Sequence, residues 1–75
     1  MTSPAVADVQ NKSVAFEGTT YSIQELGPDT FTVLVKGVPV GRIVYTFGAA
    51  NGVPEGDGVQ EALDAVAEAW FAATA

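Results

Sequence analysis

Carboxylates are the side chains in this sequence that could most readily support acid–base chemistry. The chain contains nine Asp and Glu residues and neither histidine nor cysteine. Three of the acids, Glu61, Asp64 and Glu68, recur at three- and four-residue spacing, which places them on one side of a predicted helix. A catalytic acid needs a cleft that perturbs its pKa, and the solvent side of a helix offers none. We therefore expect an acidic, solvent-exposed helix face, no catalytic residue and no enzymatic activity.

The glycine-rich segment GAANGVPEGDG, residues 48–58, is the second candidate for chemistry, because glycine-rich loops can cradle phosphates. It lacks the Gly-Lys-Ser/Thr ending of a phosphate-binding loop and has no cation nearby. Oxygens of Asn51, Glu55 and Asp57 could face Ca²⁺, but three side chains are too few for the roughly six to eight ligands that this ion takes. The segment is therefore predicted to be a connecting loop, and we expect no metal and no cofactor.

The charge balance excludes several classes of partner. Nine acidic residues face three basic ones, Lys12, Lys36 and Arg42, and the net charge is −6 at pH 7. Nucleic-acid binding depends on Lys and Arg contacts to phosphates, so we expect no direct binding to nucleic acid. The same deficit argues against binding to an anionic membrane surface. No apolar run approaches the roughly 18 residues of a membrane span, and the N-terminus lacks the pattern of a signal peptide, so we expect a cytoplasmic protein.

A predicted C-terminal helix is the clearest of the elements that position these residues. Asp57 is a suitable N-cap, and Gln60 takes the N3 position of a capping box. Trp70 is expected in the core, and Phe71, at the margin of the apolar stripe, is expected to close the edge of the core. The stripe is predicted from three- and four-residue spacing and consists of Val59, Ala62, Leu63, Val66, Ala69, Trp70 and Ala73.

Strands are predicted upstream of this helix by period-two alternation. The turn signals EG, GPDT and KG separate them. The expected strands are residues 19–26, 31–35 and 38–47, with a further short strand at residues 14–16.

The predicted fold class is α+β: a three- to four-stranded antiparallel β-meander with one C-terminal α-helix packed across one face, as a two-layer sandwich. Residues 1–12 are small and polar and are expected to form a flexible N-terminal leader. Residues 13–75 are expected to form a single small α+β domain.

The segment FTVLVKGVPVGRIVYTF, residues 31–47, carries apolar residues on both faces of its predicted strands. A two-residue turn at Lys36 and Gly37 would gather Val33, Val35, Val38 and Val40 on one face. A three-residue turn with a glycine bulge would instead place Phe31, Val33 and Val35 beside Ile43, Tyr45 and Phe47. We favour the three-residue turn, because it gathers the aromatic residues on the face that the helix can cover.

Four aliphatic residues are then left on the other face: Leu34, Val38, Val40 and Val44. They could be exposed side chains of the kind that monomers tolerate, or they could lie beneath the N-terminal segment. Alternatively they form an interface, because contiguous apolar patches usually mark association. On this second interpretation we expect a non-catalytic protein–protein interaction module, which binds a protein partner or itself as a homodimer through the second sheet face.

The acidic composition supports a different hypothesis. A small, strongly acidic chain with Glu61, Asp64 and Glu68 along one helix face could act as a phage-type inhibitor or nucleic-acid-mimicking decoy that binds another protein. Such binding would be steered by charge and should weaken as the salt concentration rises. No residue pattern in the chain names the partner or the pathway.

Overall fold

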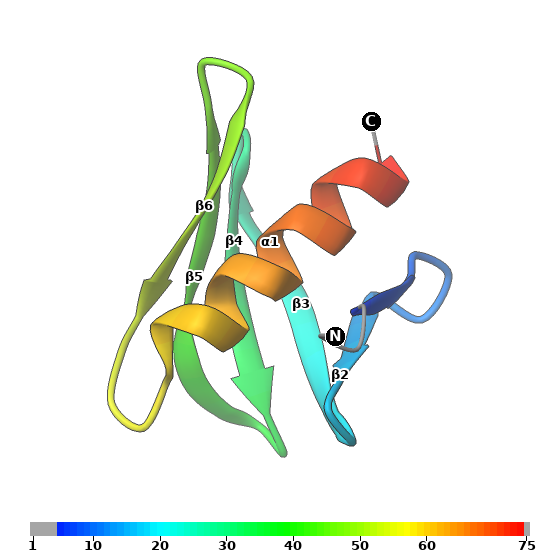
Figure 1. The fold of residues 1–75 in the computed structure, drawn as a ribbon, viewed down its shortest axis with the longest axis vertical. Helices are drawn as coiled ribbons and strands as arrows, with labels where there is room; N and C mark the ends of the chain where they lie inside the picture. The colour runs from blue at the N-terminus through cyan, green and yellow to red at the C-terminus, as the bar shows by residue number, and fades with distance from the viewer. Residues whose placement is uncertain (1–4, 75) are drawn as a thin grey trace.

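The computed structural model describes residues 5–74. Within this range six antiparallel strands form one sheet, in which each strand pairs with its neighbours in chain order. The sheet curls into a half-barrel, and the helix α1 (Gln60–Thr74) lies diagonally across its concave side (Figure 1). The strands are β1 (Val6–Asp8), β2 (Ser13–Phe16), β3 (Thr19–Gly27), β4 (Thr30–Val35), β5 (Val38–Thr46) and β6 (Ala49–Pro54).

The α+β class agrees with the prediction, but the predicted strand count of three to four was wrong. The additional short strand expected at residues 14–16 is present as β2. Two further strands lie where none was expected: β1 in the predicted leader, and β6 in the predicted connecting loop. The first four residues of that leader lie outside the described residues. Neither β1 nor β6 has an alternating apolar pattern of useful length, so strand pairing rather than local propensity forms them.

The β4–β5 hairpin differs from the favoured register. Val35 pairs with Val38 across a two-residue turn, in which Lys36 and Gly37 have φ angles of 52° and 81°; this is the type I′ geometry that matches strand twist. The predicted three-residue turn was therefore wrong. A β-bulge inside β5 at Val40 changes the face of every later residue, because Val33 pairs with Gly41 and Leu34 with Pro39.

The residue at the bulge, Val40, is bonded to the chain that follows β6. The carbonyl of Val40 accepts a hydrogen bond from the N–H of Glu55 at 2.9 Å, so it bonds to the connection between β6 and the helix. Beyond the bulge, Ile43 pairs with Phe31 and both face the helix. Phe31 and Ile43 therefore share a face, as the favoured register predicted, but they do so through a two-residue turn followed by a bulge in β5 rather than through a three-residue turn.

The core lies between the concave sheet face and the helix. Among the stripe residues, Ala62, Leu63, Val66 and Trp70 are buried as predicted, whereas Val59 is 59% exposed. Phe71 is buried at the core edge, as expected. The central cluster consists of Val14, Ile23, Val33 and Ile43 from the sheet with Leu63, Val66, Ala67, Trp70 and Phe71 from the helix.

The helix begins later than the capping pattern predicted. Its first residue is Gln60, and the N–H of Leu63 donates to the carbonyl of Val59 at 3.0 Å, so Asp57 is not the N-cap. Gln60 has a different role: its Nε2 donates to the carbonyl of Gly52 at 2.7 Å. The N–H of Gly52 donates in turn to Oδ1 of Asp64 at 3.0 Å. The side chains of Gln60 and Asp64 thus bond to both backbone polar groups of Gly52, as the backbone of a neighbouring strand would.

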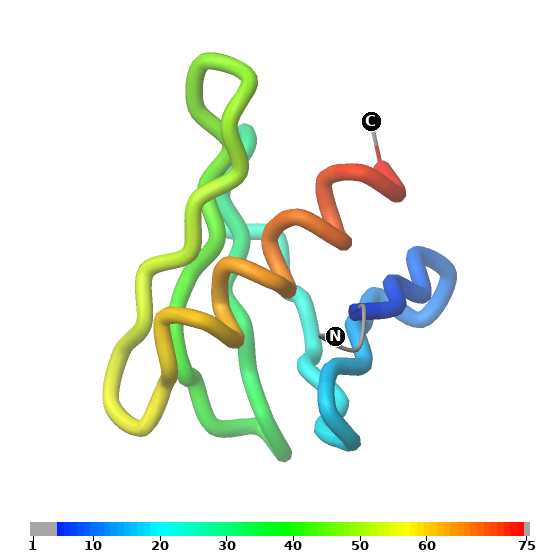
Figure 2. The backbone as a smooth tube through the Cα atoms, in the orientation of Figure 1, coloured from blue at the N-terminus to red at the C-terminus, as the bar shows by residue number. Residues whose placement is uncertain are grey.

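An antiparallel meander places successive turns at opposite ends of the sheet (Figure 2). We call one end the Lys36 end; it carries the turn at Glu17 and Gly18, the turn at Lys36 and Gly37, and the first turn of α1. We call the other the Phe47 end; it carries the turn at Pro28 and Asp29, the turn at Phe47 and Gly48, and the last turn of α1. Within the described residues, no helix is long and apolar enough to cross a membrane.

Candidate functional site

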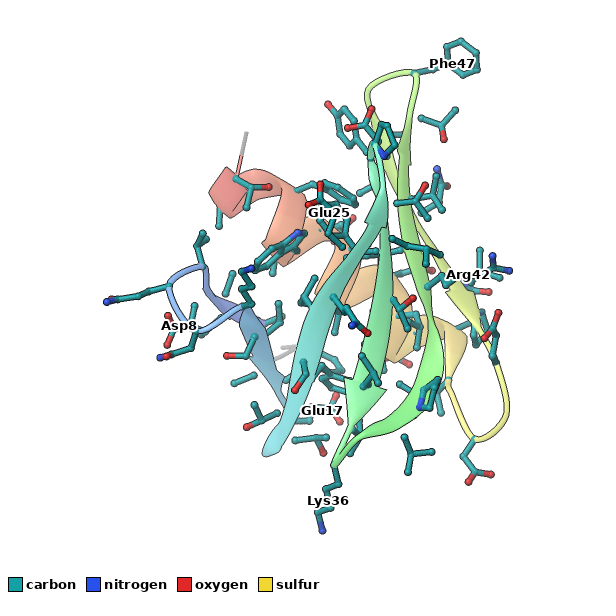
Figure 3. The ribbon with its side chains drawn as sticks, turned by 180° about the vertical axis from the view of Figure 1, so that it is seen from behind. Asp8, Glu17, Glu25, Lys36, Arg42 and Phe47 are labelled. Atoms are coloured by element: carbon teal, nitrogen blue, oxygen red, sulfur yellow. The ribbon has the colours of Figure 1, made fainter. Side chains whose placement is uncertain are left out.

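Phe47 is the most unusual side chain on the described surface. It lies at the tip of the β5–β6 hairpin, where it projects away from the rest of the protein (Figure 3), and it is 102% exposed. Its φ angle is 51°, in the left-handed region that costs an L-residue other than glycine about 1–2 kcal/mol. A large aromatic side chain in this position gains no burial and adopts an unfavourable backbone. Such an outlier marks a candidate site of interaction.

The turn itself does not require phenylalanine. Two other turns in the chain have the same backbone: Glu17 and Lys36 have φ angles of 49° and 52° and are each followed by glycine. In those turns the side chain is charged and exposed, as expected for a residue that contacts only solvent. The backbone therefore accepts a polar residue at this position, and the aromatic ring of Phe47 needs another explanation.

A cavity of about 430 Å³ opens beside this hairpin at the Phe47 end. Its aromatic lining is Phe31, Tyr45 and Phe71, in which the ring centroids of Phe31 and Phe71 are 5.6 Å apart and those of Tyr45 and Phe71 are 5.1 Å apart. Its remaining lining residues are Glu25, Pro28, Asp29 and Thr74. The sheet therefore supplies two of the aromatic rings and the helix supplies the third.

Strand pairing fixes the two carboxylates of this cavity next to its aromatic rings. Glu25 pairs with Phe31 across the β3–β4 ladder, so both side chains lie on the same face of the sheet. The N–H of Tyr45 donates to the carbonyl of Asp29 at 2.9 Å, which holds the β3–β4 turn against β5. Both acids are exposed, and no Lys or Arg is among the described residues that line this cavity.

A second cavity, of about 230 Å³, adjoins the first and shares Glu25, Phe31 and Thr74 with it. Trp70 lines this smaller cavity and is only 5% exposed. Its Nε1 has no hydrogen-bond partner among the described residues, and a buried N–H donor without a partner is unfavourable. We call the two cavities together the aromatic groove. Lys12 also lines the smaller cavity.

The helix adds to the negative potential of the groove. Thr74, the last residue of α1, lines both cavities, so the end of the helix that carries partial negative charge faces the groove. The last turn of the helix contains no basic residue. Glu25, Asp29 and the C-terminal end of the helix therefore all contribute negative potential to the larger cavity.

The predicted interaction face is divided between the two sides of the sheet. Val40 packs against the core cluster, and Val38 lines a cavity with Leu63 of the helix, so both lie on the concave side. Leu34 and Val44 lie on the convex side, because the strand register places their neighbours Val33 and Ile43 in the core. The two-residue turn pairs Val38 with Val35 and so separates it from Leu34, and the bulge at Val40 moves Val44 to the convex side. The four residues therefore do not form one surface.

The predicted acidic helix face is also altered. Glu61 and Glu68 are exposed, but Asp64 is half-buried and its Oδ1 accepts hydrogen bonds from the N–H of Gly52 and from Nε2 of Gln60. This carboxylate holds the helix to β6. Two of the three predicted acids remain available to solvent at the helix surface.

Asp8 is the carboxyl group with a perturbed pKa. Its side chain accepts hydrogen bonds from Nδ2 of Asn11 at 2.7 Å and from the backbone N–H of Asn11 at 3.2 Å, and these bonds lower the pKa of Asp8 below its ordinary value. Asp8 is the last residue of β1, next to the β1–β2 turn, and its carboxyl group is fully exposed to solvent. Among residues 5–74, no three His, Cys, Asp or Glu side chains lie close enough together to hold a metal ion.

Sequence reasoning missed the candidate site, since it assigned Phe47 to the face that the helix covers. A signal was present: Phe-Gly at residues 47 and 48 matches Glu-Gly at 17 and 18 and Lys-Gly at 36 and 37, and X-Gly between two strands indicates a tight turn. The pairing of Glu25 with Phe31 depends on the β3–β4 register, which the sequence does not display.

The comparisons with known proteins found no family, no curated protein and no solved structure that matches this chain.

Proposed function

We propose that this protein is a non-catalytic protein–protein interaction module that binds a partner protein through its Phe47 end. The observation that carries the proposal is the complete exposure of Phe47 at a positive φ angle. Aromatic residues dominate the binding energy of protein interfaces when they enter a pocket on the partner. A phenylalanine that projects from a hairpin has the shape for such insertion, and Tyr45, two residues earlier in β5, extends the aromatic surface.

The net charge favours a partner other than a second copy. Each chain carries −6 at pH 7, so two copies repel each other unless the interface is large. Self-association through the convex sheet face has limited support, because its apolar residues Leu34 and Val44 alternate with Thr32 and Arg42. The homodimer remains an alternative that a mass measurement separates from the present proposal. A cytoplasmic location stays a prediction.

The acidic decoy receives less support from the arrangement of the acids. A mimic of nucleic acid needs a regular row of free carboxylates, and Asp64 is bound to Gly52 and Gln60 rather than directed to solvent. Glu61 and Glu68 are left on that side of the helix.

A capture experiment with paired variants tests the proposal. The tagged wild-type chain, Phe47→Asn and Val59→Asn are incubated with a native extract of the cells that make the protein, and bound proteins are quantified by mass spectrometry. Asn suits the left-handed turn position, so Phe47→Asn should keep the fold. Val59 is an exposed apolar residue at the Lys36 end and provides the matched control.

We expect proteins that wild type and Val59→Asn retain equally and that Phe47→Asn loses. Capture that is indifferent to Phe47→Asn would contradict the proposal. Sedimentation equilibrium of the purified chain should give the monomer mass of 7.7 kDa. A stable dimer that Phe47→Asn does not dissociate would replace the present proposal by the homodimer.

A further inference from the structure

The aromatic groove has a composition that indicates the chemistry of its ligand. Its larger cavity combines three aromatic rings, Phe31, Tyr45 and Phe71, with the carboxylates of Glu25 and Asp29. Aromatic faces attract cations through the ring quadrupole, and carboxylates pair with guanidinium and ammonium groups. These two kinds of group favour the same kind of ligand and occupy one cavity of about 430 Å³.

A third feature acts in the same direction. The last residue of α1, Thr74, lines the larger cavity, and the unpaired carbonyls at a helix C-terminus favour a cation. The chain itself supplies no Lys, Arg or His in the last helical turn. A cation bound in the larger cavity would complete this end of the helix on the side away from Lys12, which lines the smaller cavity with Thr74.

The chain's own cations do not fill the larger cavity. Arg42 pairs with Glu55, with Nε 3.1 Å from the carboxylate oxygen Oε2, and Lys36 lies at the opposite end of the sheet (Figure 3). Lys12 lines the smaller cavity and is not among the described residues that line the larger one. The positive charge of a ligand therefore belongs in the larger cavity, away from Lys12.

The smaller cavity distinguishes a peptide from a simple cation. Trp70 lines it beside Val9, Ile23 and Phe31, so the smaller cavity offers mainly apolar surface. The apolar part of a peptide can pack on this surface, whereas a small cation alone gains nothing from it. Because the two cavities share Glu25, Phe31 and Thr74, one extended segment can occupy both.

We infer that the aromatic groove binds an extended basic segment of the partner protein, with an Arg or Lys side chain in the cavity formed by Phe31, Tyr45, Phe71, Glu25 and Asp29 and with a neighbouring apolar part of the segment against Trp70. This inference rests on the proposed function, since it names the chemistry of the partner. It is specific for a positively charged side chain on a peptide, because each negative group of the cavity opposes an acidic one.

A peptide titration tests the inference without knowledge of the partner. The probe is the blocked pentapeptide Gly-Leu-Arg-Leu-Gly, and the matched control peptide carries citrulline in place of arginine, which keeps the shape and removes the charge. Both are titrated into the full ¹⁵N-labelled chain at low salt, and amide and indole N–H shifts are recorded by NMR. We expect the arginine peptide to shift the Trp70 indole signal and the amides of Tyr45 and Phe71, with at least about tenfold weaker binding of the citrulline peptide.

Two double variants separate a specific site from general attraction to an acidic protein. Glu25→Gln with Asp29→Asn and Glu61→Gln with Glu68→Gln each remove two negative charges, so that the net charge changes from −6 to −4 in both. The first pair should weaken arginine-peptide binding about tenfold, whereas the second, on the exposed helix surface, should change it less than about twofold.

Equal weakening by both pairs, equal binding of both peptides, or no shift at the groove would overturn the inference. These outcomes do not decide the proposed function. If the peptide fails to bind but Phe47→Asn still abolishes partner capture, the interaction module stands and only the basic-peptide groove is wrong. If capture is indifferent to Phe47→Asn, the proposed function fails whatever the peptide does.

Discussion

The Lys36 end and the Phe47 end of the sheet contain the same kind of tight turn, but the side chains that these turns expose are charged at the Lys36 end and aromatic at the Phe47 end. At the Lys36 end the turns present Glu17 and Lys36 to solvent. A cavity of about 390 Å³ there is lined mainly by aliphatic residues under the first turn of the helix. At the Phe47 end the equivalent turn presents a bare phenylalanine, and the cavity beside it is aromatic and acidic.

The comparison of the two ends separates the backbone of a turn from the side chain that it presents: the same turn geometry carries Lys36 at one end and Phe47 at the other. The meander and the helix fix where each end lies, and the helix dipole gives the ends opposite partial charges. The side chains placed there also differ: one cation and one acid, Lys36 and Asp57, line the cavity at the helix start, whereas two acids, Glu25 and Asp29, line the cavity at the helix end. The described lining of the cavity at the Phe47 end is therefore the more negative of the two.

Both ends keep their surfaces because the helix is held diagonally across the sheet at Gly52 of β6. Gly52→Ala should disrupt the contact between β6 and the helix, and we expect it to lower the free energy of unfolding more than any other change proposed below. A Cβ atom at this position would lie 2.5 Å from the backbone carbon of Leu63, so the helix would have to move. We expect a loss of about 3 kcal/mol in the free energy of unfolding. Urea denaturation measures it, with Gly27→Ala as the matched control.

Gly27 also lies in a strand, but an added Cβ would meet nothing within 4 Å. Gly27→Ala should change the free energy of unfolding by no more than about 0.5 kcal/mol. Similar losses in the two variants would mean that the close approach of the helix at Gly52 does not decide its position.

A smaller effect separates the acid that holds the helix from the acids that face solvent. Asp64→Ala removes the acceptor for the N–H of Gly52 and for Gln60, and we expect a loss of about 1–2 kcal/mol. Glu68→Ala, four residues further along the helix and exposed, should stay within about 0.5 kcal/mol of wild type. Thermal and urea unfolding followed by circular dichroism measure both. If Asp64→Ala and Glu68→Ala lost the same stability, the three acids would be equivalent surface residues, as the sequence predicted.

Phe47→Asn tests the comparison between the two turns directly. Because Asn tolerates a positive φ angle better than Phe, and Phe47 has no burial to lose, we expect a gain in stability of about 0.5–1 kcal/mol. Lys36→Asn, at φ 52° in the equivalent turn, should give a similar gain. A loss of stability in Phe47→Asn alone would show that Phe47 supports the fold, which would weaken its assignment as a binding residue.

The smallest expected effect concerns Asp8, the last residue of β1. Its hydrogen bonds with Asn11 lower the pKa of Asp8 in the folded chain. A lowered folded pKa adds stability that is complete above the unfolded pKa and is lost as the pH falls through the folded pKa. Carboxyl ¹³C shifts during an acid titration should show the lowered pKa, and Asn11→Ala should return it toward the ordinary value. An unchanged pKa in Asn11→Ala would remove this bond as the cause.

Much of the fold could be predicted because its signals are local. The helix stripe around Leu63, Val66 and Trp70 repeats with the helical period, and the turns at residues 17–18, 28–29 and 36–37 each contain residues with a specific backbone preference. By contrast, β6 contains Asn51, Gly52 and Pro54, which are unfavourable in strands. It forms because β5 and the helix together satisfy its backbone, and no local pattern reports such contacts.

In the candidate site too, the features that depend on neighbouring residues could be predicted, and those that depend on strand pairing could not. The Phe-Gly pair at residues 47 and 48 is a local signal of a tight turn, and the excess of acids gives the chain its net charge of −6 at pH 7. Long-range contacts, by contrast, set the exposure of Phe47, the separation of Val38 from Leu34, and the position of Glu25 and Asp29 beside three aromatic rings. The last two depend on how strands pair, which no local pattern reports: the two-residue turn puts Val38 opposite Val35, and the β3–β4 register puts Glu25 opposite Phe31.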